Sequence, residues 1–284
     1  MKMKIDHVTI AGSNLRELEA EFENLGMKTD YGGPHSNGVT HMSLLGFDDG
    51  SYIELISVMK TGPSPVWTKF IEEDGGPCAW AVQVDDIASE VARIRKLGVT
   101  ATGPEDYSRK RPDGILVEWQ LGFTGDKAPG ATLPFLIKDK TLREFRVKPS
   151  SSISQKGKAA SRLSGLEKVV LGVTNLEKEI ELFQTVYGWG NPQRSESALE
   201  GATVAQFENT PVTLASPRND GWLRERLTKF GDAPCAFLIG TNDIQGAEKK
   251  YGLGNKQKWF KNTIAWISTL KQKGIMLGFI DQGR

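Results

Sequence analysis

The 284-residue sequence lacks any long apolar run and any clear excess of one charge. No stretch approaches the roughly 20 apolar residues of a transmembrane helix, so we expect no contact with a membrane. Thirty-six Lys and Arg residues against 35 Asp and Glu residues leave a net charge of +1, which does not favour nucleic acid as a partner. The N-terminal Met-Lys-Met-Lys has no signal-peptide core, and we therefore expect a cytoplasmic protein.

Cysteine is also scarce. The two cysteines, Cys78 and Cys235, each lie in an apolar segment and share the surroundings Pro-Cys-Ala-aromatic. Each segment is typical of a strand, so we expect two small buried apolar residues and no disulfide.

The chain contains one pattern four times. A short apolar segment runs into Asn or Asp, then Leu or Ile, and then a charged stretch typical of a helix. The copies begin at Ile5, Pro77, Leu166 and Pro234. A repeat of this length indicates one supersecondary unit used again, and so an α/β fold built from similar modules.

Each copy predicts a β-α-β-β unit, and the first has room for one more short strand near residues 27–31. The Asp-Asp-Gly at residues 48–50 is a hairpin signal between two such strands. The fourth copy is degenerate. The expected helices are 17–25, 88–97 and 176–187, and the expected strands after them are 39–47, 52–58, 114–123, 133–138, 203–207, 211–215, 259–267 and 275–280.

Residues 147–164 are rich in Ser, Lys and Ala and show no apolar period. This composition indicates a linker. We therefore expect an N-terminal domain of two modules at residues 1–146 and a C-terminal domain at residues 165–284.

Strand alternation predicts a polar face in the first copy. Side chains two residues apart share one face of a strand, and the helix must cover the more apolar face. The remaining faces then converge on one concave surface. Its expected members are His7, Thr9, His41, Ser43, Tyr52 and Glu54.

Three interpretations of this surface remain open. His7, His41 and Glu54 suit a metal held by two imidazoles and a carboxylate. They also suit acid/base catalysis, with Glu54 moving a proton and His41 or His7 orienting it. Alternatively, all of them line a binding cavity in which Ser43 and Tyr52 hold a small molecule.

The later copies lack these groups. Ala79, Lys168 and Ala236 stand at the position of His7, and the strand Leu-Pro-Phe-Leu-Ile-Lys has no carboxylate where the first copy has Glu54. Thr213 stands near the Glu54 position in the third copy. We therefore expect the functional cavity in the N-terminal half.

Further residues could contact a ligand. Glycines in the loop of residues 32–38 permit close backbone approach, and His35 could close over a bound molecule. Arg111 belongs to a basic run, residues 109–111, that could bind an anionic group. Trp119 is expected to face the cavity, where it could stack on a ligand or pack in the core.

The sequence resembles the vicinal oxygen chelate superfamily, which includes glyoxalase I, extradiol dioxygenases and bleomycin-resistance proteins. Within it, the chain is most similar to the glyoxalase-like domain group. The resemblance rests on DHVTIAG, GGPHSNGVTH, DGSYIELISV, RPDGILVEWQLGF and LPFLIK, which together span residues 5–138. It implies tandem βαβββ modules paired into concave half-barrel sheets.

The resemblance also implies a metal site, because such proteins place a metal-binding His on the first strand of a module and a Glu on the last. His7 and Glu54 match these places, whereas Ala79 does not supply the third ligand. What is implied is either a reduced site for Zn, Ni, Mn or Fe, completed by His41 or water, or a metal-free cavity. The expected activity is that of a lyase, isomerase or dioxygenase acting on a small oxygenated molecule; the alternative is a resistance-type binder. A monomer or a homodimer is expected.

Overall fold

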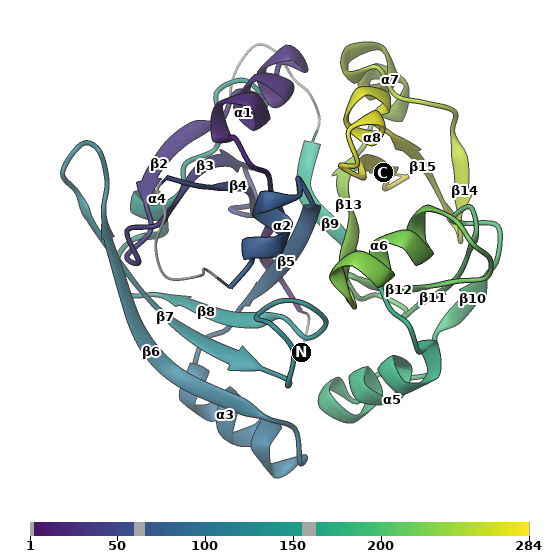
Figure 1. Cartoon of the computed structure of the whole chain (residues 1–284), viewed down its shortest axis with the longest axis horizontal. Coiled ribbons are helices and arrows are strands. Elements are labelled where there is room, and N and C mark those ends of the chain that lie inside the picture. The colour runs from purple at the N-terminus through teal and green to yellow at the C-terminus, as the bar shows by residue number, and fades with distance from the viewer. Residues whose placement is uncertain (1–2, 60–65, 155–162, 284) are drawn as a thin grey trace.

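Two curled sheets of eight strands each make up the protein (Figure 1). The computed structural model describes residues 3–59, 66–154 and 163–283. The first sheet has the order β2-β3-β4-β1-β5-β8-β7-β6, and the second repeats it as β10-β11-β12-β9-β13-β16-β15-β14. The paired βαβββ modules implied by the resemblance are thereby confirmed.

In the first sheet, the two modules join through β1 and β5, which pair antiparallel. Each module closes on itself, because its last strand pairs parallel with its first. The elements are β1 (Ile5–Ala11), α1 (Leu15–Asn24), β2 (Asp30–Pro34), β3 (Thr40–Gly46), β4 (Tyr52–Val58), α2 (Thr68–Glu72), β5 (Gly76–Gln83), α3 (Ile87–Lys96), β6 (Ala101–Lys110), β7 (Leu116–Thr124), β8 (Phe135–Asp139) and α4 (Arg143–Arg146).

The second sheet is built in the same way but with shorter outer strands in its last module. Its elements are β9 (Leu163–Gly172), α5 (Leu176–Tyr187), β10 (Gln193–Ser195), β11 (Ala202–Gln206), β12 (Val212–Pro217), α6 (Trp222–Phe230), β13 (Ala233–Thr241), α7 (Ile244–Tyr251), β14 (Gln257–Trp259), β15 (Asn262–Trp266), α8 (Ser268–Gln272) and β16 (Leu277–Asp281). Because β14 spans 3 residues where β6 spans 10, the fourth module is the most altered.

The recurring Asn or Asp of the repeat caps the helix of each module. Its side-chain oxygen accepts a hydrogen bond from a backbone N–H in the first helical turn, which would otherwise lack a partner. The acceptors are Asn14, Asp86, Asn175 and Asp243, each 2.9–3.1 Å from the nitrogen it binds.

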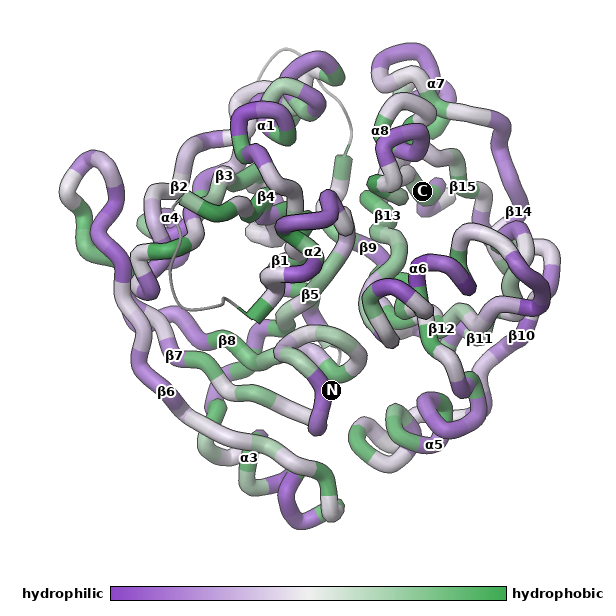
Figure 2. The backbone as a smooth tube through the Cα atoms, viewed as in Figure 1, coloured by the Kyte–Doolittle hydropathy of each residue, from purple (hydrophilic) through white to green (hydrophobic). Residues whose placement is uncertain are grey.

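Helices α1 and α3 cover the convex side of the first sheet with one apolar face each. In α1 this face consists of Leu15, Leu18 and Phe22, which are spaced at three and four residues and are buried. Figure 2 shows the hydropathy along the backbone: β13 is mostly hydrophobic, whereas the helices carry hydrophilic and hydrophobic residues in turn. The concave side of the first sheet is left for the site described below.

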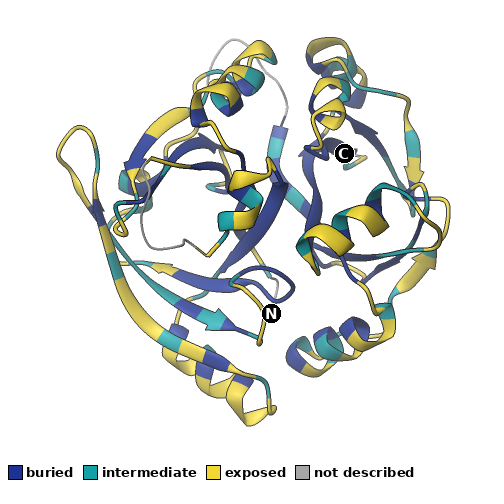
Figure 3. Ribbon diagram, viewed as in Figure 1, coloured by how far each residue is buried: buried dark blue, intermediate teal, exposed yellow. Residues whose placement is uncertain are grey.

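The two halves pack against each other through β5 and β13, whose residues are buried almost throughout (Figure 3). Arg226 of α6 crosses this boundary. Its guanidinium is buried and donates hydrogen bonds to the carbonyl oxygens of Gly75, Pro77 and Pro234. Both cysteines are free and buried, as predicted.

Several elements were not predicted from the sequence, among them α2, α6, β6 and β10. The basic run at residues 109–111 falls outside every strand expected from the sequence, yet Arg109 lies in β6. Part of the expected linker, residues 155–162, lies outside the described residues. The part before it packs on the first sheet, where the Ser150 backbone N–H donates to Gly46 O at 2.9 Å. The domain limits at residues 146 and 165 stay a prediction. Within the described part of the chain, no helix is long and apolar enough to cross a membrane.

Candidate active site

A cavity of about 310 Å³ opens on the concave face of the first sheet. One end is polar and the other is apolar. The polar lining includes His7, His35, Asn37, Thr40, Tyr52, Glu54, Arg109 and Arg146, and the apolar lining includes Met42, Ile56, Trp67, Trp119, Leu121, Phe123, Phe135 and Ile137.

His7 and Glu54 come together through the parallel pairing of β1 with β4. His7 lies opposite Tyr52 and Thr9 lies opposite Glu54, so all four side chains share the concave face. The Nε2 atom of His7 is 3.9 Å from Glu54 Oε2, and both side chains are buried. The His7 ring stacks on Tyr52 with ring centres 4.6 Å apart.

The expected place of His41 in this site is wrong. Strand β3 pairs Met42 with Ile56, which puts Met42 on the cavity side and His41 on the opposite side. His41 Nδ1 instead lies 3.4 Å from the Tyr31 hydroxyl. The apolar and polar residues of β3 do not alternate regularly, so its sequence does not fix which side chains face the cavity. A register error of one residue exchanges the two faces of the strand.

Ser43 shares this correction, because it lies two residues from His41 on the same strand. Its hydroxyl donates to Thr29 Oγ1 at 2.9 Å, outside the cavity. Arg111 also lies elsewhere: it forms an ion pair with Asp113 at 2.7 Å and donates to Phe145 O. Trp119 does line the cavity.

His35 also lies at the polar end of the cavity, beside Glu54. Its Nε2 atom lies 3.3 Å from Glu54 Oε1, and its Nδ1 atom lies 2.9 Å from Thr40 Oγ1. Asn37 shapes the loop by accepting hydrogen bonds from the backbone of Val39 and Thr40. The Glu54 carboxylate therefore lies between His35 and His7.

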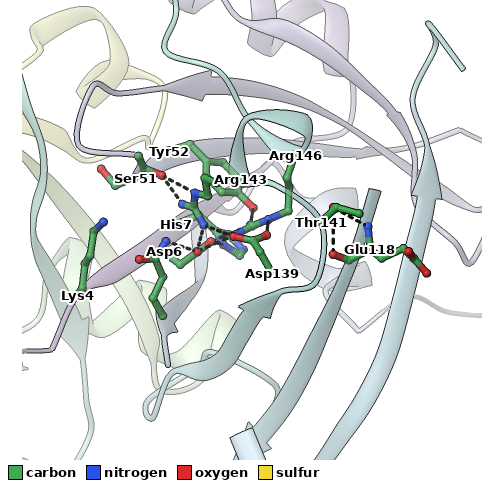
Figure 4. Close-up of polar contacts among 12 residues, drawn as sticks. Lys4, Asp6, His7, Ser51, Tyr52, Glu118, Asp139, Thr141, Arg143 and Arg146 are labelled. Carbon is green, nitrogen blue, oxygen red and sulfur yellow. Dashed lines mark hydrogen bonds and ion pairs between the residues drawn. The ribbon is translucent and has the colours of Figure 1, made fainter. Parts of the chain in front are cut away.

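A buried ionic network lies behind His7 (Figure 4). Asp6 Oδ1 is 2.7 Å from His7 Nδ1, and Arg146 donates to both oxygens of Asp6 at 2.9 Å. Arg143 and Asp139 extend the network, since Arg143 pairs with Asp6 and Arg146 also pairs with Asp139. Sequence reasoning missed this network because its members are up to 140 residues apart.

The network keeps Asp6 ionised. Burial opposes the charge of Asp6, but the guanidinium of Arg146 and the hydrogen bonds from His7 and Arg146 hold the Asp6 pKa well below its usual range. An ionised Asp6 accepts a hydrogen bond from His7 Nδ1, which fixes the ring and turns Nε2 toward the cavity.

Glu54 is also ionised at neutral pH. Burial alone would raise its pKa, but the hydrogen bond and charge of His35, together with the charges of His7 and Arg109, lower it. A buried carboxylate held between two imidazoles can accept a proton from a bound molecule, and either ring can orient it.

The donor set fits a metal in chemistry but not in spacing. His7 and His35 each have Nδ1 engaged by another group and Nε2 near Glu54, as metal-binding histidines do. Nevertheless, no group of three or more His, Cys, Asp or Glu residues within the described ranges is placed to hold an ion.

The second module does not complete a centre. Phe135 of β8 lies opposite Ala81 of β5, just as Glu54 of β4 lies opposite Thr9 of β1. Phe135 thus fills the place that corresponds to Glu54, and Ala79 fills that of His7. A centre with four protein ligands cannot form here.

The C-terminal half has no counterpart of the His7–Glu54 pair. A cavity of about 1030 Å³ is lined by Lys168 and Thr210, and also by Lys4 and Asp49 of the first half. Lys168 stands at the place of His7 and donates a hydrogen bond to Thr210 O, while Thr213 stands at that of Glu54. An apolar cluster fills the concave face, with Trp259, Trp266 and the α6 residue Leu223 among its members. Helix α6 has 9 residues where its counterpart α2 has 5, and its Leu223 and Leu227 belong to this cluster.

Paired βαβββ modules with a polar cavity on the concave face define the vicinal oxygen chelate class of proteins. The glyoxalase-like domain family matches residues 5–187. The chain therefore belongs to this family.

Solved structures share the fold across nearly the whole chain. A hypothetical protein from Staphylococcus aureus has a TM-score of 0.64 at 16% identity, covering 98% of each chain. A mutant of 4-hydroxymandelate synthase from Streptomyces coelicolor has a TM-score of 0.64 at 12% identity, covering 99% of this chain and 92% of the other. A Mn(II)-bound glyoxalase from Novosphingobium aromaticivorans has a TM-score of 0.54 at 11% identity, covering 99% and 82%. A comparison with curated proteins gives no match.

Proposed function

We propose that the N-terminal cavity is an active site in which Glu54 moves a proton of a small oxygenated molecule. One observation carries the proposal: an ionised, buried carboxylate lies between two imidazoles at the polar end of the cavity. Burying such a charge is costly unless the group is used or paired. The reaction class is that of an isomerase or lyase that removes a proton from a carbon beside an oxygen.

The residues divide the work by position. Glu54 accepts the proton, and His35, at 3.3 Å, holds the carboxylate in place. His7 is fixed by Asp6 through Nδ1 and presents Nε2 to the developing charge on the substrate oxygen. The aromatic side chains Trp67 and Trp119 exclude water from the apolar body of the substrate.

The test is solvent deuterium exchange. A panel of small hydroxyketones and oxo acids is incubated with the protein in D₂O, and the loss of carbon-bound protons is followed by NMR. We expect exchange by the wild type and a loss of roughly a hundredfold or more in Glu54→Gln, the usual contribution of a general base. Lys168→Ala is the matched control and should exchange normally. No exchange by the wild type, with binding retained, would instead favour the resistance-type binder.

A divalent metal is the second candidate, and the engaged Nδ1 atoms of His7 and His35 favour it. Since these two rings and Glu54 are not spaced to hold an ion in this structure, they would have to move closer together to bind one, which when bound would polarise substrate oxygens as a Lewis acid. The Mn(II) of the Novosphingobium glyoxalase belongs to that protein. Elemental analysis of protein purified without chelators, compared with Glu54→Gln, tests this. Metal at the same level in both proteins would exclude the site.

A further inference from the structure

Arg109 is a buried cation on the wall of the cavity. It projects from β6 and is only 7% exposed, yet it lines the cavity together with Glu54. Its guanidinium donates to two backbone carbonyls, Gly32 O and Arg146 O. A guanidinium has five N–H donors, so three remain without an acceptor within the described ranges.

Arg109 forms no ion pair with another residue in the described part of the chain. The neighbouring network matches its own charges, with Asp6 and Asp139 facing Arg143 and Arg146. By contrast, no carboxylate of the described chain lies within ion-pair distance of Arg109. Glu54 is near enough to influence its charge, and burial lowers the pKa of Arg109, but no contact joins the two groups. A buried guanidinium of this kind is costly without an anion.

Strand alternation places aromatic side chains beside this charge. Tyr107 lies two residues before Arg109 on β6 and faces the same side. Trp119, opposite Tyr107 on β7, stacks on it with ring centres 6.3 Å apart. A planar apolar group can therefore lie against the aromatic wall while a charged group at its end reaches the guanidinium.

We propose that Arg109 binds a carboxylate of the ligand, so that the cavity takes small carboxylic acids with an apolar, ring-like body. The planar fork of a guanidinium matches the two oxygens of a carboxylate better than a single oxygen. The inference rests on the proposed function only in taking this cavity as the binding site. The contact with Arg109 fixes the carboxylate end of the ligand, while the apolar end lies against the aromatic wall.

The bound carboxylate also acts on Glu54. It would draw the field of Arg109 away from Glu54 and place a second negative charge near it. Both effects raise the Glu54 pKa above its value in the free protein. Glu54 is therefore a stronger base when the ligand is bound.

The test compares two probes of nearly equal shape, phenylacetate and phenylacetamide, by titration calorimetry at pH 7. We expect the wild type to bind the acid roughly ten- to hundredfold more tightly than the amide, the value of a hydrogen bond to a charged group. Arg109→Gln should lose this preference but keep its affinity for the amide. Arg111→Gln, on the same basic run but outside the cavity, is the control and should keep the preference.

Equal affinity of the wild type for both probes, or no binding of the acid, would overturn the inference without any variant. So would an Arg109→Gln protein that still prefers the acid. If Arg109→Gln does not fold, Arg109→Lys should keep the preference in weakened form, and an undiminished preference would count against the fork. Deuterium exchange by a wild type that shows no preference would leave the proton-transfer proposal intact while removing this one.

Discussion

Asp6 is the residue on which the geometry of the site depends. It is wholly buried, and four side chains, His7, Gln83, Arg143 and Arg146, donate to it. Its only sequence signal is that it precedes a histidine in an apolar strand. Neither arginine could be assigned to it from the sequence, because α4 follows β1 by well over a hundred residues.

Asp6→Asn should destabilise the protein by about 3–5 kcal/mol at pH 7, the cost of leaving a buried cation unpaired. Because the folded-state pKa of Asp6 is depressed, its stabilisation is complete above the unfolded pKa of about 3.9 and is lost as the pH falls through the folded pKa. The gap between wild type and variant should therefore narrow below pH 4. Urea unfolding at pH 7 and pH 3 measures both effects.

The matched control for this experiment is Asp113→Asn, since the Asp113 side chain is half exposed and forms an ion pair with Arg111 on the surface. Its effect should stay below about 1 kcal/mol. Equal unfolding free energies of Asp6→Asn and Asp113→Asn at pH 7 would contradict the role assigned to the network.

Strand alternation predicts which face of the sheet carries His7 but not which face carries His41. In β1 the apolar side chains Val8 and Ile10 mark one face clearly, so the opposite face of His7 could be predicted. In β3, Met42 and Leu44 are as apolar as the residues beneath a helix, yet they share the concave side and cluster with Tyr52. Only the hydrogen-bond register with β4, a tertiary property, decides this strand.

At the scale of elements, the repeated Asn or Asp was read as the boundary of a helix, and the structure explains why each copy has it. The four helices α1, α3, α5 and α7 begin directly after this residue. Local hydrogen bonding fixes this position, so it could be predicted. By contrast, β6 has exposed residues at most positions and no apolar alternation, and it is recognisable only by its pairing with β7.

Replacing one cap should cost about 0.5–2 kcal/mol. Asn14→Ala and Asn175→Ala each remove a capping hydrogen bond, from Arg16 N at 3.0 Å and from Lys178 N at 3.1 Å. We expect similar losses of unfolding free energy in both variants, measured by urea denaturation. Glu23→Ala, an exposed residue of α1, is the control. A loss that is no larger in the cap variants than in the control would contradict the assignment of the repeat residue.

At the scale of the whole molecule, the halves share one apolar cluster and are joined by Arg226. We therefore expect a single calorimetric unfolding transition. Arg226→Met keeps an unbranched stem but removes the guanidinium, which leaves three buried carbonyls without their donor, and it should lower the unfolding free energy by a few kcal/mol. Two separate transitions in the wild type would show that the boundary does not couple the halves.

The C-terminal half, which has Lys168 and Thr213 at the places of His7 and Glu54, should not take part in binding. Lys168→Ala removes the lysine that stands at the place of His7, and it should leave the affinity for phenylacetate within about twofold of the wild type, whereas Glu54→Gln should change it. Calorimetry on both variants, with melts to confirm folding, checks this. A loss of binding in Lys168→Ala alone would move the site to the other half of the molecule.

The two cysteines give each half its own chemical reporter. Cys78 and Cys235 lie at equivalent places in β5 and β13, and both thiols are free and buried. Burial raises the pKa of Cys78 well above its usual range and that of Cys235 to about 12, so neither forms the reactive thiolate while folded. Alkylation, followed peptide by peptide in a mass spectrometer, therefore times the opening of each half separately. Equal alkylation rates of the two cysteines would mean that both halves open together. Faster alkylation of Cys78 would mean that the N-terminal half opens while the C-terminal half stays folded.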